Sequence, residues 1–542
     1  PDEDKMNLGK IYHMGKEEAA GLILNRQAMA SHTFITGSTG TGKSNAVYHL
    51  LDEITKNGQT TFLVVEPAKG EYKNVFGNCT DVQVFGTNPR ETPLLRMNPF
   101  AFPENIHILE HIDRLVEIFN ACWPMYAAMP AVLKDAIERS YQKVGWDLRN
   151  SESEKGVFPT FFDLLDILPG VIEESHYSKD TQSDYVGALC TRVKSLTNGI
   201  YGSVLCAEDA LTDEALFDRN VIVDLSRVGS METKSLLMGI LVMKLQEYRM
   251  CSSGMNSRLR HVTVLEEAHN LLRKTSAEQS QEGANLQGKS VEMLANAIAE
   301  MRTYGEGFII ADQAPGLLDM SVIRNTNTKI ILRLPDEEDR KLVGKSAALK
   351  EAQIDELSKL PLGVAAVYQN EWPEAVLCKI EAYPMPENAV YHKPSKMPHE
   401  INAEFVFGQL AAGKELEPLS ISEMEQLKLW LKRHEMMLKP EDGRYLEQVF
   451  AGGELDVAKT RKAVFDFFGG ISTVVDYCAA AEKSFTPRKE FLEQLQGQYG
   501  LKAAAADWVL NSVISMGMSL NPDAKAVDNL RTNFEQQGGR VL

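Results

Sequence analysis

Short apolar runs alternate with longer segments of helical periodicity between residues 32 and 334 of the chain. The expected strands are His32–Thr36, Thr61–Val65, Val82–Phe85, Val221–Leu225, Val262–Leu265, Gly307–Ala311 and Lys329–Arg333, followed by Val364–Tyr368 and Ala375–Ile380. Strands that alternate with helices are typical of βαβ units, whose strands form a mostly parallel sheet. The pattern therefore predicts an α/β core over residues 31–383.

The strand pattern is interrupted in the middle of this core. Apolar residues at helical spacing predict helices at Ile108–Phe119, Ala131–Val144 and Tyr185–Asn198. We expect these helices to form an insertion on the sheet, at about residues 103–215.

The character of the chain changes again after Ile380. Prolines oppose both helix and strand, and four of them between residues 384 and 398 predict a linker at residues 384–418. Residues 419–542 then predict a C-terminal helical domain, whose clearest helices are Glu423–Leu438, Pro487–Tyr499 and Ala503–Met516. Two of these helices resemble a helix-turn-helix, but a brace or partner-docking domain is the preferred interpretation.

Composition narrows the class of protein. The 542 residues are 44% hydrophobic and 24% charged, as in globular proteins, and the net charge of −18 argues against a surface that binds nucleic acid everywhere. A basic groove or pore within an acidic shell stays possible. The seven cysteines form no CxxC pair, so neither a disulfide framework nor a zinc knuckle is indicated. Because no apolar run is long enough to cross a bilayer, we expect a cytoplasmic protein with no membrane partner.

The strongest chemical signal follows the first expected strand. The run fits GxxxxGK[ST] and consists of Gly37, Ser38, Thr39, Gly40, Thr41, Gly42, Lys43 and Ser44, with Asn45 continuing into an expected helix. Glycines let backbone N–H groups surround phosphates, and the start of the helix adds positive potential. Lys43 is placed to reach the β- and γ-phosphates and Ser44 to offer its hydroxyl to Mg²⁺. The run predicts a site for ATP and Mg²⁺.

Two further strands end in polar side chains. The run HVTVLEEAH brings Glu266 and Glu267 to the end of one strand, where the first acid supports Mg²⁺ and the second polarises the attacking water. The run GFIIADQ ends in Gln313, a candidate sensor of the γ-phosphate. Arg302 lies at the end of the intervening helix, where it either compensates the helix dipole or acts as an arginine finger.

Together these motifs resemble the HerA branch of the HerA and FtsK superfamily of P-loop ATPases. The resemblance spans residues 7–335 and rests on HTFITGSTGTGKSN, VVEPAKGEYKN, MPAVLKDAIERSY, HVTVLEEAHNLL, EMRTYGEGFIIADQAPGLLD and NTNTKIILRLPD, in that order. It implies a RecA-like, hexameric ATPase that moves double-stranded DNA through its pore, with active sites shared between neighbouring subunits. Residues 1–30 are similar to the seam between such a core and an N-terminal β-barrel, most of which would be missing.

The resemblance also assigns roles to residues. Lys43 and Ser44 would bind nucleotide and Mg²⁺, Glu267 would be the catalytic carboxylate and Gln313 the sensor. Glu266 stands where many relatives have Asp, and so does Glu66. The finger from the neighbouring subunit would be Arg302, with two alternatives, Arg324 and Arg333.

The DNA-contacting surface is less well defined by sequence. Arg273-Lys274 and the segment Gln281–Lys289 are candidate pore loops, with a plain surface loop as the alternative. His107 and His111 lie at helical spacing, but without a nearby acidic cluster a solvated or packed pair is preferred to a metal site.

The resemblance further implies a partner that acts on DNA or on NAD. It would be an end-processing nuclease or, in bacterial antiphage defence, a nuclease or a sirtuin-like, NAD-consuming effector. Two other functions stay open: an ATPase for secretion or conjugation, and a ring scaffold that organises effector subunits.

Overall fold

The computed structural model describes two units, Pro1–Lys393 and Pro394–Leu542. Within them it describes residues 4–126, 128–153, 156–207, 210–275, 281–385, 389–394, 406, 410, 424, 427, 439–450, 455–484, 486–499 and 503–541. Most of the predicted helix Glu423–Leu438 and most of the predicted linker lie outside these residues. The predicted domain boundaries stay predictions.

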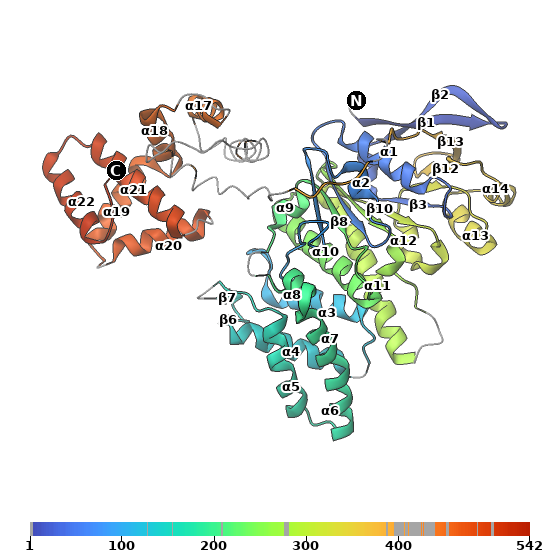
Figure 1. Ribbon diagram of the computed structural model, residues 1–542, viewed down its shortest axis with the longest axis horizontal. Helices are drawn as coiled ribbons and strands as arrows, with labels where there is room; N and C mark the ends of the chain where they lie inside the picture. The colour runs from blue at the N-terminus through green and yellow to red at the C-terminus, as the bar shows by residue number, and fades with distance from the viewer. Residues whose placement is uncertain are drawn as a thin grey trace. The chain divides into compact units, whose positions relative to one another are not determined.

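A sheet of eleven strands forms the centre of the first unit, in the order β2-β1-β13-β12-β11-β3-β10-β9-β4-β8-β5 (Figure 1). The strands are β1 (Lys5–His13), β2 (Lys16–Asn25), β3 (Thr33–Thr36), β4 (Thr61–Glu66), β5 (Val82–Gly86), β8 (Asn220–Asp224), β9 (His261–Glu266), β10 (Glu306–Asp312), β11 (Thr328–Ile331), β12 (Val364–Gln369) and β13 (Val376–Ile380). Those from β11 to β5 in this order are parallel, and β12, β13, β1 and β2 continue the sheet antiparallel. The predicted α/β fold is confirmed.

Helices cover both faces of the parallel strands. Successive residues of a strand therefore point into two different apolar cores. Phe34 packs into one core, whereas Ile35 packs into the other. One face is covered by α1 (Lys43–Thr55) and α2 (Tyr72–Phe76), and the opposite face by α3 (Ile108–Cys122), α10 (Met231–Ser252), α11 (Gln281–Glu300) and α12 (Met320–Arg324). Because both faces are buried, these strands are apolar along their whole length.

A group of short helices lies between β5 and β8, where the helical insertion is predicted. Its elements are α4 (Met129–Lys143), β6 (Trp146–Asp147), β7 (Glu152–Ser153), α5 (Phe161–Glu174), α6 (Lys179–Tyr185), η3 (Val186–Cys190), α7 (Thr191–Thr197), α8 (Gly199–Leu205) and α9 (Asp213–Phe217). Figure 1 shows most of them together beyond one end of the sheet, with α4 packed on α3 and on α5.

The sequence pattern gave no signal for the hairpin of β1 and β2. Strand β1 pairs with β13, and Gly9 faces Ile380 in this pairing. A Cβ atom on Gly9 would lie 2.1 Å from the carbonyl oxygen of Lys379, so only glycine allows this approach. Residues 5–25 are thus part of the central sheet in the described structure. Their assignment to the seam of a barrel stays a prediction.

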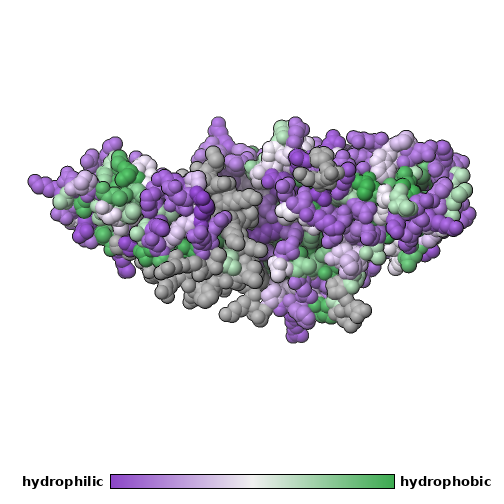
Figure 2. Space-filling model, turned by 90° about the horizontal axis from the view of Figure 1, so that it is seen from above, coloured by the Kyte–Doolittle hydropathy of each residue, from purple (hydrophilic) through white to green (hydrophobic). Residues whose placement is uncertain are grey.

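Short elements connect the strand ends of the first unit. They are η2 (Gln27–Ser31), η4 (Ala268–Asn270), η5 (Met301–Tyr304), η6 (Pro315–Leu317), α13 (Glu337–Ser346) and α14 (Glu351–Glu356). Figure 2 shows that hydrophilic residues cover most of the visible surface of the described residues, with scattered hydrophobic ones.

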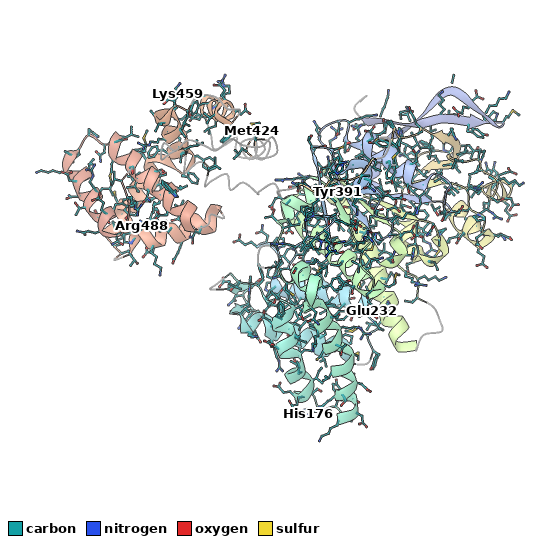
Figure 3. The ribbon with its side chains drawn as sticks, viewed as in Figure 1. His176, Glu232, Tyr391, Met424, Lys459 and Arg488 are labelled. Atoms are coloured by element: carbon teal, nitrogen blue, oxygen red, sulfur yellow. The ribbon has the colours of Figure 1, made fainter. Side chains whose placement is uncertain are left out.

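The second unit is helical and has its own apolar core. Its helices are α17 (Pro440–Phe450), α18 (Val457–Phe467), α19 (Gly470–Ala481), α20 (Pro487–Tyr499), α21 (Ala503–Leu520) and α22 (Ala524–Gln536). Arg488, labelled in Figure 3, forms an ion pair with Asp507 and so joins α20 to α21.

None of the helices in the described part of the chain is by itself long and apolar enough to span a bilayer. The pair α18 and α19 meets that criterion of length and composition when taken together, with a bend of 65° between the two helices.

Candidate nucleotide-binding and hydrolysis site

The glycine-rich loop lies between the end of β3 and the start of α1. Gly40 and Gly42 have φ values of +75° and +104°, in the region that favours glycine. A Cβ atom on Gly37 would lie 2.7 Å from Thr41 Oγ1. The three glycines therefore let the backbone turn tightly just before the helix, as a phosphate-binding loop requires.

Neighbouring strand ends hold the loop in place. The backbone N–H of Ser38 donates to the carbonyl oxygen of Arg333 (3.0 Å), which follows β11. The hydroxyl of Thr39 donates to Gln313 Oε1 (3.0 Å), which follows β10. The structure thus brings the predicted sensor Gln313 directly to the loop.

Lys43 contacts both predicted acids. Its Nζ lies 3.0 Å from Glu267 Oε1 and 3.6 Å from Glu266 Oε2. Burial disfavours the charge of Lys43, but the two carboxylates raise its pKa above the usual value. The ammonium group is therefore held in its charged form between the two acids, at the start of α1.

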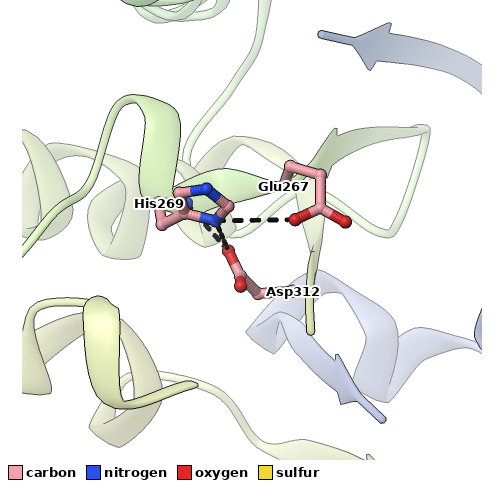
Figure 4. A group of neighbouring side chains, drawn as sticks. All are labelled: Glu267, His269 and Asp312. Atoms are coloured by element: carbon pink, nitrogen blue, oxygen red, sulfur yellow. Dashed lines mark hydrogen bonds and ion pairs between the residues drawn. The ribbon is translucent and has the colours of Figure 1, made fainter. Parts of the chain in front are cut away.

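Glu267 belongs to a second polar group, drawn in Figure 4. His269 Nδ1 lies 2.8 Å from Asp312 Oδ2 and 3.5 Å from Glu267 Oε2. The hydrogen bond to Asp312 raises the pKa of His269 above its usual value. Glu267 itself has a φ of +45°, which is uncommon for a residue other than glycine and turns its side chain out of the strand direction. Neither His269 nor Asp312 was predicted, although both adjoin predicted residues.

Tyr72 and Glu66 complete the surroundings of Glu266. The Tyr72 hydroxyl donates a hydrogen bond to Glu266 Oε1. The Glu66 carboxylate accepts the backbone N–H groups of Glu71 (2.8 Å) and Tyr72 (3.2 Å). Burial raises the pKa of Glu66 to about 8. Sequence analysis did not single out Tyr72, because its contact with Glu266 depends on the order of the strands.

The residues present fit a divalent cation that prefers oxygen ligands. Ser44, Glu66, Glu266 and Glu267 line one pocket beside Lys43. Glu267 Oε2 is buried and accepts no hydrogen bond from any residue that the structure describes. Carboxylate and hydroxyl oxygens are the donors that Mg²⁺ takes in phosphate-binding sites. Ser44 and Glu266 would hold the ion, as the sequence predicts.

Asn45 faces away from this pocket. Its side chain donates to the carbonyl oxygen of Glu381 (3.0 Å) and accepts the backbone N–H of Tyr383 (2.8 Å). Asn45 therefore ties α1 to the segment that follows β13.

The three candidate fingers lie in two places. Arg333 adjoins the glycine-rich loop of its own chain through its backbone. Arg302 and Arg324 line a polar cavity of about 530 Å³, together with Ser31 and Asn327. This cavity lies at the amino ends of β3 and β11, whereas the loop lies at their carboxyl ends. The two edges are separated by the length of β3, about 13 Å for its four residues.

The structure also shows where the candidate pore-loop residues and His111 lie. The segment Gln281–Lys289 forms the start of α11 rather than a loop. Arg273 forms a β-bridge with Leu318, and the Lys274 N–H donates to Leu317. His111 is fully buried against Glu247 (2.9 Å), so it packs as preferred above.

The fold and the arrangement of Lys43, Ser44 and the acids define a P-loop ATPase of the RecA-like class. Residues 6–244 match the family model described as "Helicase HerA, central domain". The predicted resemblance to HerA-type ATPases is thereby confirmed, and this part of the chain is similar to the HerA central domain.

Relatives named for DNA repair match beyond that domain. The "DNA double-strand break repair helicase HerA" of Sulfolobus acidocaldarius is 25% identical over 393 residues, or 70% of this chain and 69% of the relative. A "Probable DNA double-strand break repair helicase HerA" of Methanocaldococcus jannaschii is 23% identical over 67% of this chain and 74% of its own length.

Solved structures share the fold. VirB4 of Thermoanaerobacter pseudethanolicus superimposes with a TM-score of 0.52 at 17% identity, over 71% of this chain and 98% of that one. The plasmid coupling protein TrwB, in complex with the non-hydrolysable ATP analogue ADPNP, gives 0.50 at 14% identity, over 72% of this chain and 98% of its own.

Proposed function

We propose that this chain is an Mg²⁺-dependent ATP hydrolase that assembles into a hexameric ring and couples turnover to movement along double-stranded DNA. The proposal is supported by one observation above all. The loop that holds the nucleotide and the exposed Arg302 lie at opposite edges of the same parallel strands. A second copy that stacks its amino edge on the loop would supply Arg302 or Arg324 to the site. Arg333, beside the loop of its own chain, is the weaker finger.

In the proposed reaction, a water oxygen bonds to the γ-phosphorus while the bond to the bridging oxygen of ADP breaks. Glu267 takes the proton of that water through its Oε2, a buried oxygen that accepts no hydrogen bond from the described residues and lies 3.5 Å from His269 Nδ1. Lys43 leaves the two carboxylates and neutralises the phosphates, and Gln313 reports the γ-phosphate to the loop through Thr39. Mg²⁺, held by Ser44 and Glu266, would supply further charge neutralisation.

Duplex DNA enters the proposal through the relatives, which are named as repair helicases. We further propose that the partner is a nuclease or a sirtuin-like effector and that the ring acts in antiphage defence. The protein that copurifies with the ring would identify the partner and indicate what triggers the activity.

The test is the rate of phosphate release by the wild-type chain with Mg²⁺-ATP, with and without duplex DNA. Stimulation by duplex supports translocation. Turnover that ignores DNA would instead favour a secretion-type ATPase. The Glu267→Gln variant lacks the carboxylate needed for turnover. If it still assembles and has the same effect in cells as the wild type, a scaffold would be favoured.

A further inference from the structure

A buried tyrosine contacts one of the two side chains that would hold the metal ion. The Tyr72 hydroxyl donates to Glu266 Oε1. Its ring packs edge to face on the ring of the buried Tyr48, with centroids 5.0 Å apart. Tyr72 therefore contacts, from a packed position, the carboxylate on which the metal would depend.

The contact from Tyr72 selects one orientation of the Glu266 side chain. Oε1 is occupied by the phenol, which leaves Oε2 facing Lys43 at 3.6 Å. Glutamate is one methylene longer than aspartate and has one more rotatable bond, so a free Glu266 would have several orientations to choose from. Tyr72, which lines the same pocket as Lys43 and Ser44, removes that freedom.

Tyr72 is itself held rigidly. It is 2% exposed and opens helix α2. Glu66 accepts its backbone N–H and that of Glu71, which fixes the start of this helix. The contacts thus link Glu66 at the end of β4 to Tyr72 in α2, and Tyr72 to Glu266 at the end of β9.

We infer that Tyr72 is a positioning residue that orients the long Glu266 side chain for a divalent cation. This orientation lets a glutamate bind the metal ion at this position. The inference rests on the proposed function, because it assumes that the pocket takes Mg²⁺ with ATP. It gives Tyr72 no part in the bond-breaking step itself. Its effect is on metal affinity.

The experiment compares Tyr72→Phe with Tyr141→Phe. Tyr141 is a matched control, because it is also fully buried and its hydroxyl donates one hydrogen bond, to the carbonyl of Phe100, within the helical insertion. The affinity of the ADP-loaded protein for Mn²⁺ is measured by electron paramagnetic resonance, and ADP affinity without metal by calorimetry. Mg²⁺ activation of turnover is measured alongside.

Tyr72→Phe is expected to weaken Mn²⁺ binding and raise the Mg²⁺ needed for half-maximal turnover, each about 10-fold. Metal-free ADP affinity is expected to stay unchanged, and Tyr141→Phe to change none of these quantities. Equal metal affinity in the two variants would overturn the inference. If wild-type protein binds Mn²⁺ with ADP but does not hydrolyse ATP, the proposed function fails while this comparison still decides the role of Tyr72.

A double-mutant cycle tests whether Tyr72 changes metal affinity through Glu266. Glu266→Asp shortens the side chain out of reach of the phenol, so Tyr72→Phe should cost nothing further in that background. An equal loss in both backgrounds would show that Tyr72 acts by another route. Glu266→Asp alone should also weaken Mn²⁺ binding, and unchanged or tighter binding would contradict the inference even if Tyr72→Phe does not fold.

Discussion

Replacing Glu267 with Gln should change nucleotide binding and hydrolysis in opposite directions. Lys43 Nζ lies 3.0 Å from Glu267 Oε1, with both side chains only 11% exposed. Nucleotide binding must break this contact, because Lys43 then neutralises phosphate. The glutamine keeps the size of the side chain but removes the charge that competes for Lys43.

The magnitude follows from that contact. A hydrogen bond to a charged group contributes about 1.5–3 kcal/mol net, which corresponds to about 10- to 100-fold in affinity. Glu266 still holds Lys43 from 3.6 Å, so the lower end applies, and nucleotide affinity without metal should rise about 10-fold. Hydrolysis should fall by about 10² to 10⁴, the usual contribution of a general base.

Calorimetry with ADP in the absence of metal measures the first effect, and phosphate release with Mg²⁺-ATP the second. Glu174→Gln is a suitable control, because it removes an acid that pairs with Arg139 at 2.6 Å on the surface of the helical insertion. The control should change neither quantity. Wild-type turnover in Glu267→Gln, or weaker nucleotide binding, would refute the assignment of Glu267.

Two more substitutions test separate parts of the structure. Lys43→Ala should abolish the rise in melting temperature that ADP produces; a wild-type rise would exclude the loop as the binding site. Glu306 is fully buried against His261 and Arg249; burial disfavours its charge, but these partners hold its pKa at about 2. A depressed pKa stabilises the fold above the unfolded value of 4.5, so the wild type should exceed Glu306→Gln by about 3 kcal/mol above pH 5. In urea unfolding of the first unit this difference should shrink as the pH falls from about 4.5 towards 2, and a gap that ignores pH would contradict the role of the ion pairs.

The parallel strands and the catalytic motif could be read from the sequence because each depends on local pattern. Apolar runs such as 261–266 form strands wherever they are buried on both faces, and a polar residue just after such a run lies at the carboxyl edge of the sheet. These two regularities together predict that Lys43 and Glu267 lie close to each other. Only the structure gives the distance between their side chains.

The rest of the site depends on the order of the strands, which the sequence does not state. Strand β9 lies between β10 and β4, so Asp312 and Glu66 flank the acids at the carboxyl end of β9. Tyr72 reaches Glu266 across 194 positions of the chain for the same reason. The β1 and β2 hairpin was missed because β2 is mostly exposed and carries charged residues at its start, so it lacks the apolar alternation of a core strand.

The central claim is that two copies of the chain share each hydrolysis site, and mixing two inactive variants tests it most directly. Lys43→Ala keeps Arg302 and Arg324, whereas the Arg302→Ala, Arg324→Ala double variant keeps Lys43. In a ring with head-to-tail contacts, an equal mixture should restore up to about one quarter of the sites. The account predicts phosphate release by the mixture at a rate well above either variant alone. No gain at any mixing ratio, with mixed assemblies shown by native mass measurement, would contradict it.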